Sequence, residues 1–194
     1  MSGFTDHGIT HSSASSINKW IEASDAWVSH YLYNNRGSSS SAMWRGIFTE
    51  QAVADTITGK SNIDDSIAKA VSDFDSKVMF DDDGSAAKER ENIEPMTRLA
   101  VEALEPFGKP VFPEDGSQHR VVMKATGDGW ALDFIGYIDF KFPEHGLIVD
   151  LKTTMRMPSV MSKPHQRQRA FYQKSSGNTV VKFLYVTPKK SQFK

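Results

Sequence analysis

The spacing of apolar residues predicts a helical N-terminal half. Between Ser12 and Leu32, large apolar residues recur at intervals of three and four positions after a serine-rich run that can cap a helix. The same spacing predicts three further helical stretches: residues 42–58, residues 62–79 and a stretch that ends at Phe107. We expect residues 12–107 to be mainly helical and residues 1–11 to be flexible.

From Gly108 onward the pattern becomes that of β-strands. Three antiparallel strands are expected: residues 118–126, 130–142 and 147–154. A tight turn at 127–129 joins the first two, and Pro143-Glu-His-Gly146 is a four-residue hairpin loop. The chain then predicts a helix from Pro164 to about Lys174.

An apolar strand at 179–187 closes the pattern, and the strand–helix–strand order predicts that it pairs in parallel. The expected fold class is therefore α/β. It combines a mixed central sheet, made of an antiparallel meander and a strand after a crossover helix, with a helical N-terminal half.

The hairpin brings two acidic residues together. If the residues that flank its loop pair with each other, Asp139 lies opposite Asp150 and Tyr137 lies opposite Lys152. Side chains alternate between the two faces of a strand, so Asp150 and Lys152 share one face. Carboxylates whose Cβ atoms are about 4.5–5.5 Å apart repel each other unless a positive charge lies between them. Mg²⁺ or Mn²⁺, which prefer oxygen ligands, would supply that charge.

Three motifs follow one another along the chain: Gly136-x-x-Asp139, Asp150-Leu-Lys152-Thr-Thr and Gln168-x-x-x-Tyr172. In this order they resemble the PD-(D/E)XK nuclease superfamily, in its RecB-type and lambda-exonuclease-like branches, many of which are encoded by phages. The alternative is an exposed hairpin without a catalytic role, which leaves the opposed acids unexplained.

The resemblance implies a restriction-endonuclease-like core and assigns roles to these residues. Asp139, Asp150 and the backbone carbonyl of Leu151 would hold Mg²⁺ or Mn²⁺, and Lys152 would assist hydrolysis. Gln168 and Tyr172 are neighbours on one helix face. Gln168 offers an amide to a water or a metal-bound group, and Tyr172 offers a hydroxyl or a stacking surface. A surface helix with Tyr172 half buried is the alternative.

Glu50 is a candidate third acid. Helical spacing places it on the core-facing side of the helix at 42–58, together with Met43, Ile47, Ala54 and Ile57, and an unpaired carboxylate is costly there. In the RecB-type branch an acid or histidine on an N-terminal helix completes the metal shell, and the segment from Arg45 to Glu50 resembles that motif. The resemblance implies that Glu50 is a metal ligand. A position at the helix edge, paired with solvent or a lysine, is the alternative.

Charge is distributed unevenly along the chain. Although the net charge is −1, residues 151–194 contain ten Lys and Arg and no Asp or Glu, so the first 150 residues carry the remaining 13 basic and all 24 acidic residues. Such asymmetry indicates an anion-binding surface, and phosphate contacts supply most non-specific DNA affinity. The candidate DNA contacts are Arg156, Lys163, Arg167 and Arg169. The alternative is a solvated basic tail.

Composition excludes several other classes of protein. There is no cysteine, so a disulfide framework, a thiolate metal site and an iron–sulfur cluster are all excluded. No apolar run approaches the roughly 20 residues of a membrane span, and the polar start differs from a signal peptide. We expect one domain of 194 residues, without a membrane partner, in the cytoplasm, or in the host cytoplasm if a phage encodes it.

These patterns and the resemblance predict a Mg²⁺- or Mn²⁺-dependent DNA exonuclease in phage or bacterial recombination or repair. The preference for an exonuclease comes from the resemblance. Three alternatives stay open: an endonuclease or junction-cleaving enzyme with the same centre, a non-catalytic DNA-end-binding module, and a protein-interaction domain without nucleic acid. Neither a homo-oligomer nor a phage recombination partner is identifiable from the sequence.

Overall fold

The structure, a computed structural model, describes residues 3–79, 84–113, 118–126, 131–177 and 179–194. It begins with a 3-10 turn at Thr5–His7 and a short strand β1 (His11–Ser12). The helices that follow are α1 (Ala14–Glu22), α2 (Ser24–Tyr31), α3 (Ser41–Ile57), α4 (Ile63–Val78), α5 (Ala86–Glu91) and α6 (Ile93–Leu104). A 3-10 turn at Glu105–Phe107 ends this helical part.

The remaining part of the chain contains most of the strands. Its elements are β2 (His119–Met123), β3 (Asp133–Ile138), β4 (Phe140–Phe142), β5 (Leu147–Thr153), α7 (Lys163–Ser175), β6 (Val180–Thr187) and β7 (Lys190–Phe193). The hairpin loop between β4 and β5 is the expected four-residue one, with a 3-10 turn at Pro143–His145 and a left-handed Gly146. The turn expected at 127–129 lies outside the described residues.

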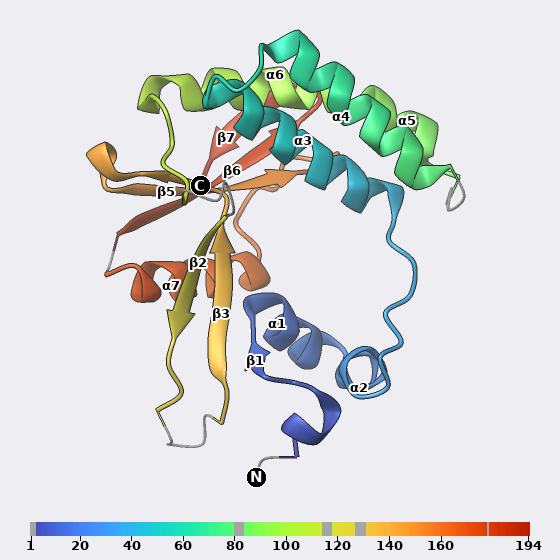
Figure 1. Cartoon of the computed structure of the whole chain (residues 1–194), viewed down its shortest axis with the longest axis vertical. Coiled ribbons are helices and arrows are strands. Elements are labelled where there is room, and N and C mark those ends of the chain that lie inside the picture. The colour runs from blue at the N-terminus through green and yellow to red at the C-terminus, as the bar shows by residue number, and fades with distance from the viewer. Residues whose placement is uncertain (1–2, 80–83, 114–117, 127–130, 178) are drawn as a thin grey trace.

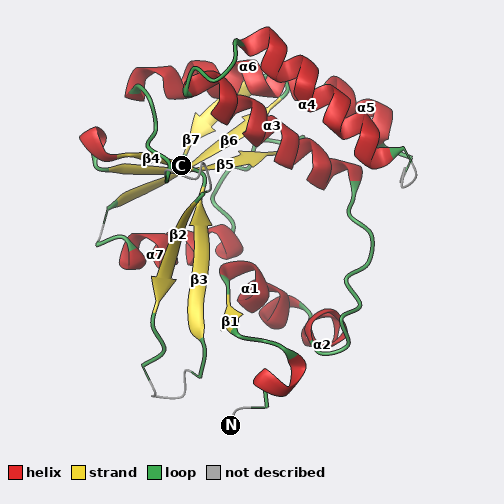
Figure 2. Ribbon diagram, viewed as in Figure 1, coloured by secondary structure: helices red, strands yellow, loops and turns green. Residues whose placement is uncertain are grey.

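The strands form two mixed sheets, in the orders β1-β3-β2 and β4-β5-β6-β7 (Figure 2). The α/β class is thereby confirmed, and so is the parallel pairing of β6 with β5. The expectation of one central sheet was wrong. The strand expected at 130–142 is interrupted at Asp139, because β3 pairs with β2 whereas β4 pairs with β5. The sequence pattern also did not predict β7, which pairs antiparallel with β6.

The hairpin register is the predicted one, because Phe142 pairs with Leu147 and Phe140 with Val149. On the N-terminal side of β4, however, the strand that pairs with this segment changes. Tyr137 pairs with Arg120 of β2 rather than with Lys152, so the predicted opposition of Tyr137 and Lys152 was wrong. The break at Asp139 is the reason, since it directs the earlier half of the strand into the other sheet.

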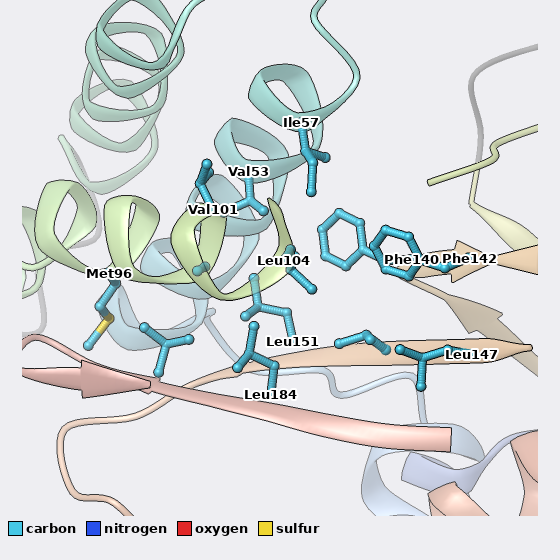
Figure 3. Packing of buried hydrophobic residues seen from close by; sticks show 13 residues of the cluster. Val53, Ile57, Met96, Val101, Leu104, Phe140, Phe142, Leu147, Leu151 and Leu184 are labelled. Atoms are coloured by element: carbon cyan, nitrogen blue, oxygen red, sulfur yellow. The ribbon is translucent and has the colours of Figure 1, made fainter. Parts of the chain in front are cut away.

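Helices cover both faces of the four-stranded sheet, with α3 and α6 on one side and α7 on the other (Figure 1). Side chains such as Leu147, Leu151 and Leu184 point toward α3 and α6 and belong to the cluster shown in Figure 3. Ile148 and Phe183 point to the opposite face, toward α7. Asp150 and Lys152 therefore lie on the α7 side, because they share the alternation of Ile148.

Serine side chains cap the N-terminal ends of α1, α3 and α7. Ser13 accepts a hydrogen bond from the Ser16 amide at the start of α1, as the serine-rich run predicted. The single helix expected as far as Leu32 is instead broken at Ala23, where φ is −157° and ψ is 85°. As a result Trp27 is buried whereas Trp20 is 52% exposed. None of the helices in the described parts of the chain is long and apolar enough to cross a membrane.

Candidate active site

Asp139 occupies the junction between the two sheets. The β2–β3 register, continued by one residue, places Gln118 opposite Asp139. The β4–β5 register, continued by one residue in the other direction, places Asp150 opposite Asp139. Asp139 thus has a neighbour in each sheet, and the predicted opposition of the two acids follows from the observed register.

Both carboxylate oxygens of Asp139 accept hydrogen bonds. The backbone N–H of Leu151 donates to Oδ2 at 2.8 Å, and the side-chain amide of Gln118 donates to Oδ1 at 3.1 Å. The same Gln118 nitrogen also donates to Oε1 of Glu50 at 2.6 Å. One amide group therefore joins a carboxylate from α3 to the carboxylate between the sheets.

Glu50 reaches this position because the N-terminal part of α3 packs closely on the end of β5. The Arg45 guanidinium is buried, forms an ion pair with Glu89, and donates to Oγ1 of Thr153 at 3.3 Å. A Cβ atom on Gly46 would lie 3.3 Å from the same Thr153 oxygen, so even alanine would require this side chain to shift by a few tenths of an ångström. These contacts bring Glu50, one turn further along α3, to the end of β5.

The helix face that Glu50 shares is a core face only in its C-terminal part, where Ile57 is buried in the core cluster and Ala54 packs against it. Met43 and Ile47, expected to be buried with it, are 43% and 44% exposed. The buried side of α3 instead carries residues such as Thr49 and Val53. The first part of this face is therefore exposed, Glu50 lines the cavity described below, and only the last part packs on the hydrophobic core.

Asp150 and Lys152 form the second half of the site. The Gln168 amide donates to Oδ1 of Asp150 at 3.0 Å. Oδ2 of Asp150 is buried and has no hydrogen-bond partner among the described residues, although the Lys152 ammonium forms an ion pair with it. Lys152 also lies over the Phe183 ring, 5.5 Å from its centroid.

Gln168 and Tyr172 connect α7 to both sheets. The Gln168 amide donates to the Tyr172 hydroxyl at 3.0 Å, and that hydroxyl donates to the Tyr137 carbonyl at 2.5 Å. The helix approaches β3 so closely that a Cβ on Gly136 would lie 2.7 Å from the Tyr172 ring. Only glycine fits there, which explains its place in the first motif.

The electrostatics of the site reflect an excess of buried negative charge. Burial and the nearby Asp150 raise the pKa of Glu50 to about 7. Burial, followed by Asp150 and Glu50, raises the pKa of Asp139 well above its ordinary value. Burial also raises the pKa of Asp150, although Lys152 opposes this effect. The pKa of Lys152 is itself raised, because attraction to the three carboxylates outweighs the effect of burial.

The donor set fits a hard divalent cation, although its geometry is not that of a ready-made cage. In the described parts of the chain, no three His, Cys, Asp or Glu side chains are grouped so that they could hold a metal ion as they stand. The Gln118 amide contacts Glu50 and Asp139, and the Lys152 ammonium contacts Asp150, where a cation would be attracted. The carboxylate oxygens, including the buried Oδ2 of Asp150, are ligands that Mg²⁺ and Mn²⁺ prefer.

The Leu151 carbonyl is oriented in a way consistent with the same role. Within a strand the N–H and C=O of one residue point to the same side. Because the Leu151 N–H donates to Asp139, its C=O also points to the edge of β5 that faces Asp139.

A cavity of about 880 Å³ opens onto these groups. Its lining includes Glu50, Asp139, Asp150, Lys152, Gln168 and Tyr172, so all six predicted side chains meet at one cavity. Its opposite wall is formed by α1, with Asn18 and Glu22 among the lining residues. The volume is in the usual range for a small-molecule or cofactor site, and too small for a whole DNA duplex.

The predicted DNA contacts are more scattered. Arg156, Lys163 and Arg169 are exposed, whereas Arg167 is half buried and donates to Oδ1 of Asn18 at 2.6 Å. A weaker ion pair joins Arg167 to Glu22 at 3.9 Å. None of these four residues is among the described residues that line the cavity. Arg167 therefore fastens α1 to α7, in addition to any contact with phosphate.

The sequence did not identify Gln118 and His165 as residues of the site. Gln118 was treated as a strand residue, because its position opposite Asp139 appears only once the β2–β3 register is known. His165 lies three residues before Gln168 on α7, lines the cavity, and has Nδ1 2.6 Å from the Tyr185 hydroxyl. Burial, with a contribution from Lys152, lowers the pKa of His165. Its helical spacing with Gln168 and Tyr172 was the signal that could have identified it.

Comparison with known proteins gives no match: neither a protein-family model, nor a curated protein, nor a solved structure is similar to this chain. The function must therefore be inferred from the fold, the cavity and the chemistry of the residues that line it.

Proposed function

We propose that this protein is a metal-dependent nuclease of the PD-(D/E)XK type that hydrolyses phosphodiester bonds in DNA and acts as an exonuclease. The observation that carries the proposal is the convergence of Glu50, Asp139 and Asp150 with Lys152 at one cavity. Two buried carboxylates and a partly buried one, all with raised pKa values, would form a poor structural core, whereas they suit a site that binds a divalent cation.

The topology supports the same class. A helix that carries an acid (α3) precedes the antiparallel pairs β2–β3 and β4–β5, which border the two further acids, and a crossover helix (α7) and a parallel strand (β6) follow; α4–α6 lie between α3 and β2. This order resembles a restriction-endonuclease-like core, with the interruption at Asp139 as a local departure. Gly136 and the tight contact of α7 give the first and third motifs a shared structural reason.

Each side chain has a chemical task in such a reaction. A divalent cation held by Glu50, Asp139 and Asp150 would polarise the scissile phosphate and lower the pKa of the attacking water. Lys152, held protonated against Asp150, would orient the water or stabilise charge that develops on the phosphate oxygens.

The residues of α7 would complete the site. Gln168 fixes Asp150 through its amide, so that the second oxygen of this carboxylate remains directed at Lys152. Tyr172 anchors Gln168 to the backbone of β3 and is not itself a proton donor to substrate in this arrangement, because its hydroxyl donates to Tyr137.

Attraction to DNA would come from the basic C-terminal segment. The exposed Lys163 and Arg169 lie on α7 and the exposed Arg156 lies in the loop before it, while other residues of α7 line the cavity. Phosphate contacts of this kind release counterions, so we expect binding to weaken steeply with salt. A protein-interaction domain would lack this dependence.

The decisive experiment follows end-labelled linear duplex and closed circular DNA with Mg²⁺, Mn²⁺ or EDTA. We expect metal-dependent loss of the linear DNA while the circle is spared. Lys152→Ala should abolish cleavage but retain DNA on a gel, whereas Lys174→Ala, on the exposed side of α7, should cleave normally.

The other outcomes identify the alternatives. Cutting of the circle would indicate an endonuclease with the same centre. Retention of DNA without cleavage under any metal condition would leave a DNA-end-binding module and refute the catalytic proposal. Unchanged turnover in Lys152→Ala would remove the role assigned to that lysine.

A further inference from the structure

We propose that Gln118 is a further ligand of the cation held by Glu50 and Asp139, and that its side-chain amide turns over to present oxygen when the cation binds. The inference rests on the proposed function, because it requires a cation at this site. It adds a residue that lies outside all three motifs and was found only through the register of β2 and β3.

The position of Gln118 is the first argument. Its Nε2 atom lies 2.6 Å from Oε1 of Glu50 and 3.1 Å from Oδ1 of Asp139. The two acids come from α3 and from the junction of the sheets, so this nitrogen is the atom that bridges them. A cation shared by these two carboxylates would be drawn to the same position between their oxygens.

The chemistry of the amide is the second argument. The NH₂ and C=O groups of a glutamine side chain are nearly identical in size and shape but opposite in polarity. A half-turn about the last side-chain bond therefore exchanges donor and acceptor without any movement of the backbone. A cation would repel the NH₂ group and attract the carbonyl oxygen, and amide carbonyls are ordinary ligands of hard cations.

Two other roles predict different behaviour. If Gln118 only clamps Glu50 and Asp139 by hydrogen bonds, any residue that cannot donate should weaken cation binding. If its amide only competes with the cation, removal of the amide should strengthen binding. The ligand role requires oxygen at this position, so glutamate should replace glutamine whereas methionine should not.

The test measures Mn²⁺ affinity by calorimetry at pH 8 for the wild-type chain of 194 residues, Gln118→Met and Gln118→Glu. We expect methionine to weaken binding by about 10- to 100-fold, and glutamate to bind as tightly as the wild type or more tightly. Gln51→Met is the matched control, because Gln51 also donates to a carboxylate, Oδ1 of Asp55 at 3.0 Å, on the same helix as Glu50. It should leave the affinity unchanged.

A second readout follows the amide itself. In protein labelled with ¹⁵N-glutamine, the Gln118 NH₂ signals are those missing from Gln118→Glu. Addition of Mg²⁺ should shift them as the hydrogen bonds to Glu50 and Asp139 are lost. Signals that keep their hydrogen-bonded shifts under saturating Mg²⁺ would overturn the proposal even if Gln118→Met failed to fold.

The affinity outcomes separate this inference from the proposed function. Tighter Mn²⁺ binding by Gln118→Met would establish a competitor, and equal weakening in both variants would establish a clamp; either result overturns the ligand role. Wild-type binding with unchanged variants also overturns it and leaves the nuclease proposal standing. Absence of Mn²⁺ binding by the wild type would refute both the ligand role of Gln118 and the proposed metal-dependent function.

Discussion

Replacement of Glu50 by glutamine should make the protein more stable at alkaline pH. The burial of this carboxylate, with the charge of Asp150, raises its pKa from 4.5 to about 7. Between these values the folded protein retains the proton that the unfolded chain has released. Stability therefore falls as the pH rises through this window, and a neutral glutamine avoids the loss.

The magnitude follows from the change in proton affinity. Each unit of pKa difference between the folded and unfolded states corresponds to about 1.4 kcal/mol. Ionisation of Glu50 therefore lowers the free energy of unfolding by about 3 kcal/mol at pH 8. For a chain of this length, that difference corresponds to roughly 6–12 °C in Tm. Glutamine also keeps an oxygen that can accept the hydrogen bond from Gln118, so the site loses charge but little packing.

The assay is thermal unfolding of both proteins at pH 5 and pH 8 with EDTA. The advantage of Glu50→Gln over the wild type should be larger at pH 8, by the amount given above. Glu102→Gln serves as the control because Glu102 is exposed on α6, and it should show no such dependence on pH. An advantage of equal size at both pH values would refute the reasoning.

A divalent cation should make the wild type more stable than Glu50→Gln at pH 8. At 1,000 times its Kd, a ligand that binds only the folded state adds about 4.1 kcal/mol, which exceeds the roughly 3 kcal/mol that ionisation of Glu50 costs at pH 8. Mn²⁺ should stabilise the wild type more at pH 8 than at pH 5, because protons compete for the carboxylates, and should stabilise Glu50→Gln much less. Equal stabilisation of the two proteins would exclude Glu50 as a ligand while leaving the pH prediction intact.

Three further substitutions test the scaffold and the surface. Gly136→Ala should cost about 1–3 kcal/mol in urea unfolding, because the added methyl group displaces two aromatic rings of α7. Arg45→Met should cost about 3–5 kcal/mol in the same assay, since it leaves the buried Glu89 carboxylate without its partner. Arg169→Ala should weaken DNA binding similarly for all sequences and reduce the salt dependence by about one counterion.

The sequence was most informative where local geometry determines the structure. The four-residue loop between Pro143 and Gly146 fixes the hairpin register, and the register alone places Asp139 opposite Asp150. Likewise, helical spacing is enough to place Gln168 and Tyr172 on one face of α7. These residues meet at the cavity as expected, because each relation spans only a few residues along one element or one hairpin.

The predictions were wrong or incomplete where contacts between distant parts of the chain determine which residues are buried or lie at the site. Apolar spacing identifies a face of α3 but not what covers each part of it, so Met43 and Ile47 were placed in the core although they are exposed. Gln118 was missed for a related reason. Its importance depends on contacts with Glu50, which is 68 residues away, and no local pattern encodes such a contact.

The interruption of the strand at Asp139 explains why the site forms where it does. In an unbroken strand from β3 to β4, residues near Asp139 would pair with β5, and the Leu151 N–H would join that ladder. The break instead leaves this N–H to the Asp139 carboxylate at 2.8 Å. It also directs β3 toward β2, which supplies Gln118. The departure from a regular sheet therefore assembles the polar groups that an uninterrupted sheet would have kept apart.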